Sequence, residues 1–181
     1  MEKLIQLIQS DNYTANHSQS VACFAKRIGC VMGLTANLLS DLFFAGLFHD
    51  IGKMVLPKNI LYKPAALNSS ERAQISLHPT IGATLAKMDD LPNSIIAMIG
   101  KHHERLDGSG YPFGLMAREI DPLTRIISVA DVYTAMIAKR PYRQALPAHV
   151  ALEELSKKNL YDQDVVSALK EVCATQKRKA V

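Results

Sequence analysis

The sequence has no tryptophan, few aromatic residues and no apolar run of the length that a bilayer requires. Its densest apolar stretch, residues 42–48, contains Gly46 and is followed by His49 and Asp50, so we expect no membrane span. The N-terminal residues lack the layout of a signal peptide. Three cysteines without a CxxC spacing favour reduced thiols over a disulfide framework or a structural zinc site. We therefore predict a cytoplasmic protein.

Length and charge narrow the class further. A chain of 181 residues suits one compact domain, and 48% apolar residues are enough for a core. The net charge of +4 is mild, and no basic stripe with interleaved aromatic residues is present, so we predict no DNA or RNA partner. We expect a single domain over residues 1–181, with a lead helix at 1–10, a core at about 11–175 and a frayed tail at 176–181.

Apolar residues recur at helical spacing along most of the chain. Helices are predicted from about residue 16 to 32 and from 36 to 49, and the second segment, apolar nearly all round, should be central. Asn68 and Glu71 have capping-box spacing, and Pro79 and Pro122 suit the first turns of later helices. Three glycines and a proline in residues 104–114 predict a shaped loop. The expected fold class is all-α.

The positions of the histidines are the most informative feature. Five of the six lie within or at the ends of apolar helical segments, and two aspartates have similar surroundings. The seven residues are His17, His49, Asp50, His78, His102, His103 and Asp131. Burying one unpaired polar group is costly, and a metal site would compensate all seven together. Imidazole and carboxylate ligands suit iron, manganese, zinc, nickel or cobalt. The sixth histidine, His149, should lie on the surface.

Seven ligands are too many for one ion that must also hold water and substrate. Two ions about 3.5–4 Å apart with a shared carboxylate fit better, and Asp50 is the natural bridge. His102 and His103 require an irregular helix end, because neighbours in a regular helix point about 100° apart. A hydroxide bridging the two ions would be the nucleophile of a phosphoester hydrolase.

At this point the sequence resembles the HD-GYP family of the HD phosphohydrolase superfamily. The resemblance rests on His49-Asp50-Ile51-Gly52-Lys53, on His102-His103-Glu104 and on the following Asp107-Gly108-Ser109-Gly110-Tyr111-Pro112. It runs from about residue 11 to 172. It implies a helical HD-type domain that hydrolyses the bacterial second messenger cyclic di-GMP to linear pGpG, and in some members onward to GMP. It also implies a bi- or trinuclear metal centre that usually contains iron or manganese, and a GGDEF-domain protein as a further partner.

The resemblance also implies residue roles. One metal would be held by His17, His49, Asp50 and Asp131. The second would be held by Asp50, His78, His102 and His103. Lys53 would lie near the bridging water and the scissile phosphate. The substrate phosphates would be held by Tyr111, Arg140 and Arg143. The loop that folds over the ligand would contain Asp107, Gly108, Gly110, Tyr111 and Pro112.

Some alternatives stay open. Members with three metals have a glutamate four residues before the first histidine, where this chain has Tyr13, so we expect two metals. From the residues alone, Lys53, Arg140 and Arg143 could be solvated cations, and Tyr111 could serve packing only. The chain could also be a receptor or scaffold that binds the nucleotide or a diguanylate cyclase without catalysis, although all seven ligands favour an enzyme. Another cyclic dinucleotide, such as cyclic GMP-AMP, is a further candidate substrate.

Overall fold

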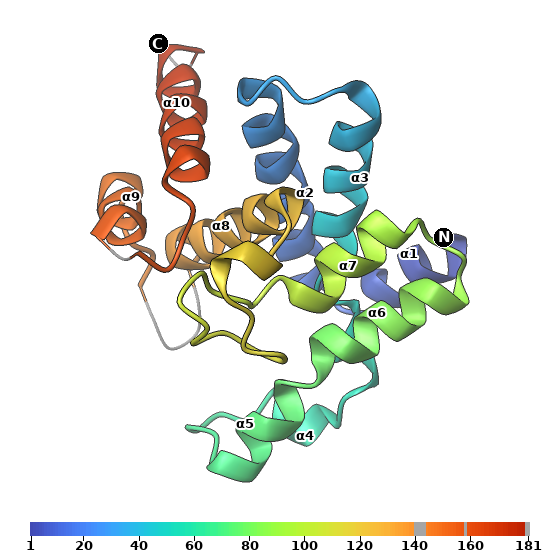
Figure 1. Ribbon diagram of the computed structural model, residues 1–181. Helices are drawn as coiled ribbons and strands as arrows, with labels where there is room; N and C mark the ends of the chain where they lie inside the picture. Colours follow the sequence, from blue (N-terminus) through green and yellow to red (C-terminus); the bar gives the residue numbers. More distant parts are fainter. Residues whose placement is uncertain (140–143, 158, 180–181) are drawn as a thin grey trace.

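The predicted all-α architecture is confirmed by a computed structural model (Figure 1). The structure describes residues 1–139, 144–157 and 159–179, without the side chains of Tyr13 and residues 176–179. Within these ranges there is no strand, and the one β-type contact is an isolated bridge between Asp107 and Met116. Among the described helices, none combines the length and the apolar composition that a membrane span requires.

In chain order the α-helices are α1 (Glu2–Gln9), α2 (Asn12–Val31), α3 (Ala36–Phe48), α4 (Lys58–Leu61), α5 (Ser69–Ile75), α6 (His78–Met88), α7 (Asn93–Lys101), α8 (Pro122–Ile137), α9 (Ala148–Lys157) and α10 (Gln163–Lys179). Two short 3-10 helices, η1 (Ile51–Val55) and η2 (Ala117–Glu119), lie between them.

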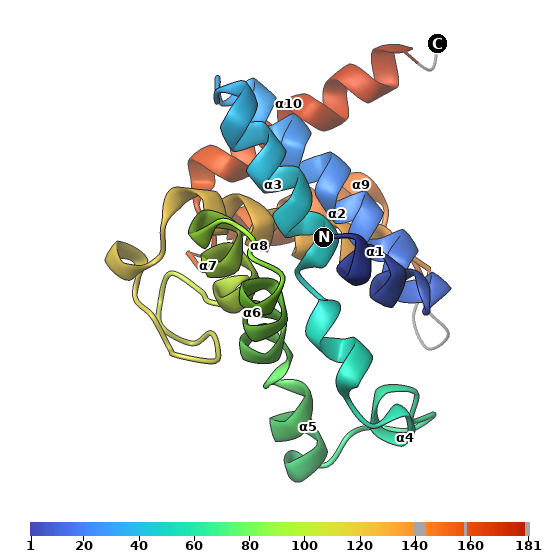
Figure 2. The same cartoon turned by 90° about the vertical axis from the view of Figure 1, so that its right-hand side faces the viewer.

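The core lies where α2 packs against α3 and α8, and α7 packs against α3 and α6 (Figures 1 and 2). Its fully buried side chains include Ile28, Phe48, Ile99, Ile127 and Leu169. Burial of each such side chain stabilises the fold by about 1.5–3 kcal/mol. The helices α9 and α10 cover one side of α8, and the segment with α4 and α5 projects from the other end. This core fixes the helix ends that carry the candidate ligands.

Local signals set several helix boundaries as predicted. Asn68 Oδ1 accepts from the Glu71 N–H, and the Glu71 side chain accepts from the Asn68 N–H, which completes the capping box of α5. The N–H of Thr124 donates to Asp121 Oδ1 at 2.9 Å, and Pro122 begins α8. Pro79 lies in the first turn of α6.

Other boundaries differ from the expectation. The helix α2 begins at Asn12 rather than near residue 16, and α5 ends at Ile75 rather than near His78. Met32, expected on the inner face of α2, lies beyond the end of that helix and is exposed. The helix α10 runs through Lys179, and the predicted domain bounds, including the tail at residues 176–181, stay predictions.

Candidate metal centre

The seven predicted ligands come together from five segments of the chain. His49 and Asp50 lie between α3 and η1, His78 is the first residue of α6, and His102 and His103 follow the last residue of α7. His17 and Asp131 come from within α2 and α8. The irregular backbone at the α7 end lets both adjacent histidines face the cluster, as predicted.

A close approach between η1 and α6 places Asp50 beside His78. A Cβ on Gly52 would lie 2.1 Å from the His78 carbonyl oxygen and 2.7 Å from the Gly82 nitrogen. Only glycine therefore allows the two backbones to pack this tightly. As a result, Asp50 Oδ1 lies 3.2 Å from His78 Nε2.

Three of the histidines share a tautomer that directs one nitrogen into the cluster. In each, Nδ1 contacts the carbonyl oxygen three residues earlier. The distances are 2.8 Å for His49 to Gly46, 2.7 Å for His78 to Ile75 and 2.8 Å for His102 to Ile99. A carbonyl oxygen can only accept, so Nδ1 carries the hydrogen and Nε2 of the neutral ring carries a lone pair. This is the usual support of a metal-binding imidazole.

These lone pairs face other acceptors. His78 Nε2 and His102 Nε2 lie 3.3 Å apart, and His49 Nε2 lies 3.3 Å from Asp50 Oδ2. His49 Nε2 and Asp50 Oδ1 are buried without a hydrogen-bond partner. Acceptors that face one another at these distances repel each other, and a cation between them removes the repulsion. The donor set therefore fits a metal.

The electrostatics of the cluster set the charge states of several candidate ligands. Burial lowers the pKa of His103 to about 3, and burial together with the neighbouring imidazoles lowers the pKa of His102 well below its usual value. Burial disfavours the Asp50 carboxylate, but His49 and Lys53 hold its pKa well below the usual range. Near neutral pH, His102 and His103 are thus neutral and Asp50 is charged. Burial opposes the charged form of His49, but Asp50 and Asp131 raise its pKa, so a cation bound there would displace a proton from this ring.

Asp131 lies among three of the histidines. Its Oδ1 is 2.9 Å from His17 Nε2 and 3.7 Å from His49 Nε2, and its Oδ2 is 3.7 Å from His103 Nδ1. Burial opposes the charged Asp131 carboxylate, but the hydrogen bond from His17 and the nearby imidazoles lower its pKa strongly. Asp131 can therefore bind a cation together with these histidines.

Ligand atoms within 4.8 Å of one another form three overlapping groups among the described residues. The groups are Asp50 with His78, His102 and His103; His17 with His49 and Asp50; and His49 with His102 and Asp131. The first group is the set expected for the second metal. Of the set expected for the first metal, three members form one group. The fourth, Asp131, lies in a different group, with His49 and His102. Asp50 joins the first two groups.

Lys53 and Tyr111 border the cluster. Lys53 Nζ donates to Asp50 Oδ2 at 2.6 Å, so this lysine is directed at the centre. The Tyr111 ring lies 4.7 Å from the His103 ring and 6.4 Å from the His78 ring, measured between centroids. Burial raises the pKa of Tyr111, and Asp50 and Asp131 add to this effect. The phenol therefore keeps its proton and can donate it in a hydrogen bond.

The remaining predicted residues have mixed outcomes. Gly108 has a positive φ of 77°, whereas Gly110 is required for close packing: a Cβ there would lie 2.4 Å from the Arg105 nitrogen. Asp107 is exposed and accepts from the Ser109 N–H and hydroxyl. His149 is exposed, as predicted. Arg140, Arg143 and the Tyr13 side chain lie outside the described residues.

Sequence reasoning missed one buried residue next to the cluster. Glu104 directly follows His103, and its side chain is 3% exposed. Its carboxylate accepts from the N–H groups of Phe113 and Leu115, on the returning limb of the loop. The available signal was its position directly after the double histidine.

Known proteins resemble this chain over most of its length. The family model described as "HD domain" matches residues 2–165. A 3'3'-cGAMP-specific phosphodiesterase 1 of Vibrio cholerae is 42% identical over 134 residues, which are 74% of this chain and 31% of that protein. A cyclic di-GMP phosphodiesterase of Thermotoga maritima is 38% identical over 165 residues, with 87% of this chain and 44% of that protein covered. The chain thus spans less than half the length of these relatives.

Solved structures share the fold. An HDG"Y"P protein from Bdellovibrio bacteriovorus has a TM-score of 0.73 at 22% identity, covering 88% of this chain and 52% of that chain. The HD domain of L. monocytogenes phosphodiesterase PgpH, in complex with cyclic-di-AMP, has a TM-score of 0.68 at 20% identity, covering 96% of this chain and 95% of that chain. At these identities the likeness concerns the fold alone.

Proposed function

This chain belongs to the HD domain family, in its HD-GYP branch, and we propose that it is a metal-dependent phosphodiesterase that hydrolyses cyclic di-GMP. The observation that carries the proposal is the sharing of Asp50 between a four-residue and a three-residue ligand group. A shared carboxylate is what two neighbouring cations require. Relatives named as phosphodiesterases of cyclic dinucleotides support the substrate class.

Two divalent ions, with iron or manganese first and nickel, cobalt or zinc as alternatives, fit these ligands. Asp50, His78, His102 and His103 would hold one of them. His17, His49, Asp50 and Asp131 would hold the other. When bound, such ions supply charge stabilisation and a hydroxide nucleophile at neutral pH.

The chain's own side chains would bind and orient the phosphodiester. The ammonium of Lys53, 2.6 Å from Asp50 Oδ2, lies at the edge of the ligand cluster, where it can neutralise charge that grows on a phosphoryl oxygen. The protonated Tyr111 phenol can donate to a phosphate or stack on a base. Arg140 and Arg143 are three residues apart in the sequence and would hold a flanking phosphate through their guanidinium forks.

A second candidate substrate is 3'3'-cGAMP, because a relative at 42% identity is named for its hydrolysis. The two substrates differ in one base, so the same mechanism would cleave both, and relative rates on the two would tell which one the enzyme prefers. A receptor without catalysis would need no complete ligand set, and all seven side chains lie in this cluster. A GGDEF-domain partner and a cytoplasmic location stay predictions.

The test combines metal and product analysis on one preparation. Protein purified without oxygen is assayed for bound metal and incubated with cyclic di-GMP and with 3'3'-cGAMP, and the products are separated by chromatography. We expect about two ions per chain and conversion of cyclic di-GMP to pGpG. The exposed His149 offers a control, and His149→Ala should change neither metal content nor turnover. Metal-loaded protein that binds the nucleotide without cleaving it would refute the enzyme and favour the receptor.

A further inference from the structure

The loop that follows the double histidine is held from inside by a carboxylate. Glu104 Oε1 accepts from the Phe113 N–H at 2.7 Å, and Oε2 accepts from the Leu115 N–H at 2.9 Å. Each carboxylate oxygen therefore accepts one hydrogen bond, and the two donors are backbone N–H groups two residues apart. Glu104 belongs to none of the ligand groups within the described ranges. Its role is distinct from metal binding.

The Glu104 carboxylate depends on these two N–H groups, because the nearest cationic side chain has other partners. Arg125 lines the same small cavity, of about 10 Å³, but its guanidinium donates to Asp162 and to the carbonyl oxygens of Ala117 and Ile120. Backbone N–H groups remain the partners of the buried carboxylate, and such charge-assisted bonds are strong. Glutamine places an NH2 donor where one of the two carboxylate oxygens lies, so in this geometry one of the two N–H groups faces a donor and loses its acceptor.

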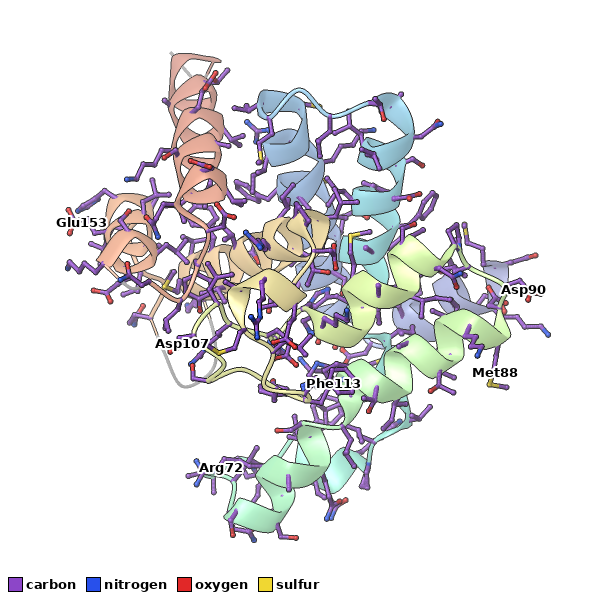
Figure 3. The ribbon with its side chains drawn as sticks, viewed as in Figure 1. Arg72, Met88, Asp90, Asp107, Phe113 and Glu153 are labelled. Atoms are coloured by element: carbon purple, nitrogen blue, oxygen red, sulfur yellow. The ribbon has the colours of Figure 1, made fainter. Side chains whose placement is uncertain are left out.

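Glu104 accepts from residues that follow Tyr111 in the sequence, whereas the double histidine precedes Tyr111. On the near side, Gly110 packs against the backbone of residues 103–105, and the Tyr111 N–H donates to the His103 carbonyl oxygen at 3.3 Å. Glu104 fixes the loop on the far side, at residues 113 and 115. Figure 3 labels Phe113 where the loop runs toward the N-terminal end of α6. Tyr111 is thus held between two attachments to the same short turn.

We propose that Glu104 is a positioning residue that sets the Tyr111 ring over the metal centre. The 4.7 Å separation of the Tyr111 and His103 rings is the geometry that the clamp maintains. The inference rests on the proposed function for its effect on turnover, although the clamp itself can be measured without activity. Loss of the clamp frees the loop and lowers the fraction of molecules in which Tyr111 meets the substrate.

Glu104→Gln is the test variant, and Glu119→Gln is its matched control. Glu119 is exposed and also accepts from a loop N–H, that of Met116 at 2.9 Å. We expect Glu104→Gln to lower kcat/KM on cyclic di-GMP by at least about tenfold with unchanged metal content, and Glu119→Gln to change it by less than about twofold. The rate on bis(p-nitrophenyl) phosphate, a small diester without bases, should persist in both. Equal loss on both substrates would point to general damage and overturn the proposal.

A double-mutant cycle asks whether Glu104 acts through Tyr111. In a Tyr111→Ala background, Glu104→Gln should lower kcat/KM on cyclic di-GMP by less than about twofold, because the ring that Glu104 positions is absent. An equal cost in both backgrounds contradicts the inference. If Glu104→Gln does not fold, Glu104→Asp retains both oxygens on a shorter arm, and an intermediate loss that also vanishes without Tyr111 is expected.

Amide hydrogen exchange followed by NMR separates the clamp from the proposed function. The Phe113 and Leu115 N–H groups should exchange at least about tenfold faster in Glu104→Gln, while the amides of α7 and α8 keep their wild-type rates. Unchanged exchange at both positions would refute the clamp even in an active enzyme. Accelerated exchange in a protein that cleaves no cyclic dinucleotide would leave the clamp standing and refute the proposed function alone.

Discussion

Replacing Asp50 by asparagine tests the shared centre most directly. The carboxylate is buried, and its two oxygens face different partners: Oδ1 faces His78 and His102, and Oδ2 faces His49 and Lys53. Asparagine keeps the shape but removes the charge that both ligand groups use. We therefore expect Asp50→Asn to weaken both ions together, whereas a ligand of only one ion should leave the other in place.

The size of the effect follows from linkage. One ion at about 100 times its Kd stabilises the folded state by about 2.7 kcal/mol. For a domain of this size 1 kcal/mol raises Tm by about 2–4 °C, so each ion should add about 5–11 °C. Removing one unit charge about 4 Å from another costs about 4 kcal/mol at an effective dielectric constant near 20, close to a 10³-fold loss of affinity. At the same metal concentration, the metal-dependent rise in the Tm of Asp50→Asn should then be under about 1 °C.

The assay is thermal unfolding of chelator-treated protein titrated with Mn²⁺, with bound metal quantified in parallel. Asp164 provides the matched control, because it is exposed in the first turn of α10 and belongs to no ligand group within the described ranges. Asp164→Asn should keep the full metal-dependent rise in Tm. An Asp50→Asn protein that retains two bound ions and half or more of the wild-type rise in Tm would refute the shared role of Asp50.

Three further predictions follow from the same centre. Lys53→Met should lower kcat by roughly 10²-fold, and Arg143→Ala should raise KM several-fold with a smaller change in kcat, both with normal metal content in steady-state assays; the opposite pattern would reverse the two roles. Anomalous scattering from crystals should reveal two ions, and a fully occupied third site near Tyr13 would contradict this number. In metal-free protein the folded pKa of His103 is lowered from 6.5 to about 3, so its contribution to stability is present above pH 6.5 and is lost as the pH falls from about 6.5 toward 3. His103→Gln should therefore reduce the slope of unfolding free energy against pH in this window, by up to about 1.4 kcal/mol per pH unit in urea titrations.

Much of the fold could be predicted because local chemistry determines it. The capping box at Asn68 and the proline at the start of α8 act within a few residues of themselves. The start of α2 was misplaced because its first turn is mostly polar and carries little apolar periodicity. The end of α5 lies earlier than expected, at Ile75 rather than near His78. The turn at residues 76–77 contains no glycine, and the proline that suggested a helix end follows only after His78.

The clustering of the seven candidate ligands could be predicted, but not how they are grouped. Seven polar side chains in apolar surroundings require a common partner, whatever the tertiary structure. Which nitrogen or oxygen faces which neighbour depends on packing between distant segments, such as the contact of Gly52 with the His78 carbonyl oxygen. Sequence spacing therefore could not reveal that Asp131 groups with His49 and His102.

Glu104 marks the limit of this reasoning. An acidic residue at the start of a glycine-rich loop usually lies in solvent, where neither its charge nor its length has a particular role. Here the two N–H groups that it accepts from are nine and eleven residues further along the chain, a separation with no helical or strand period. Only the folded loop brings them back to the carboxylate. The buried Glu104 carboxylate thus fastens this loop to the end of α7, next to His102 and His103.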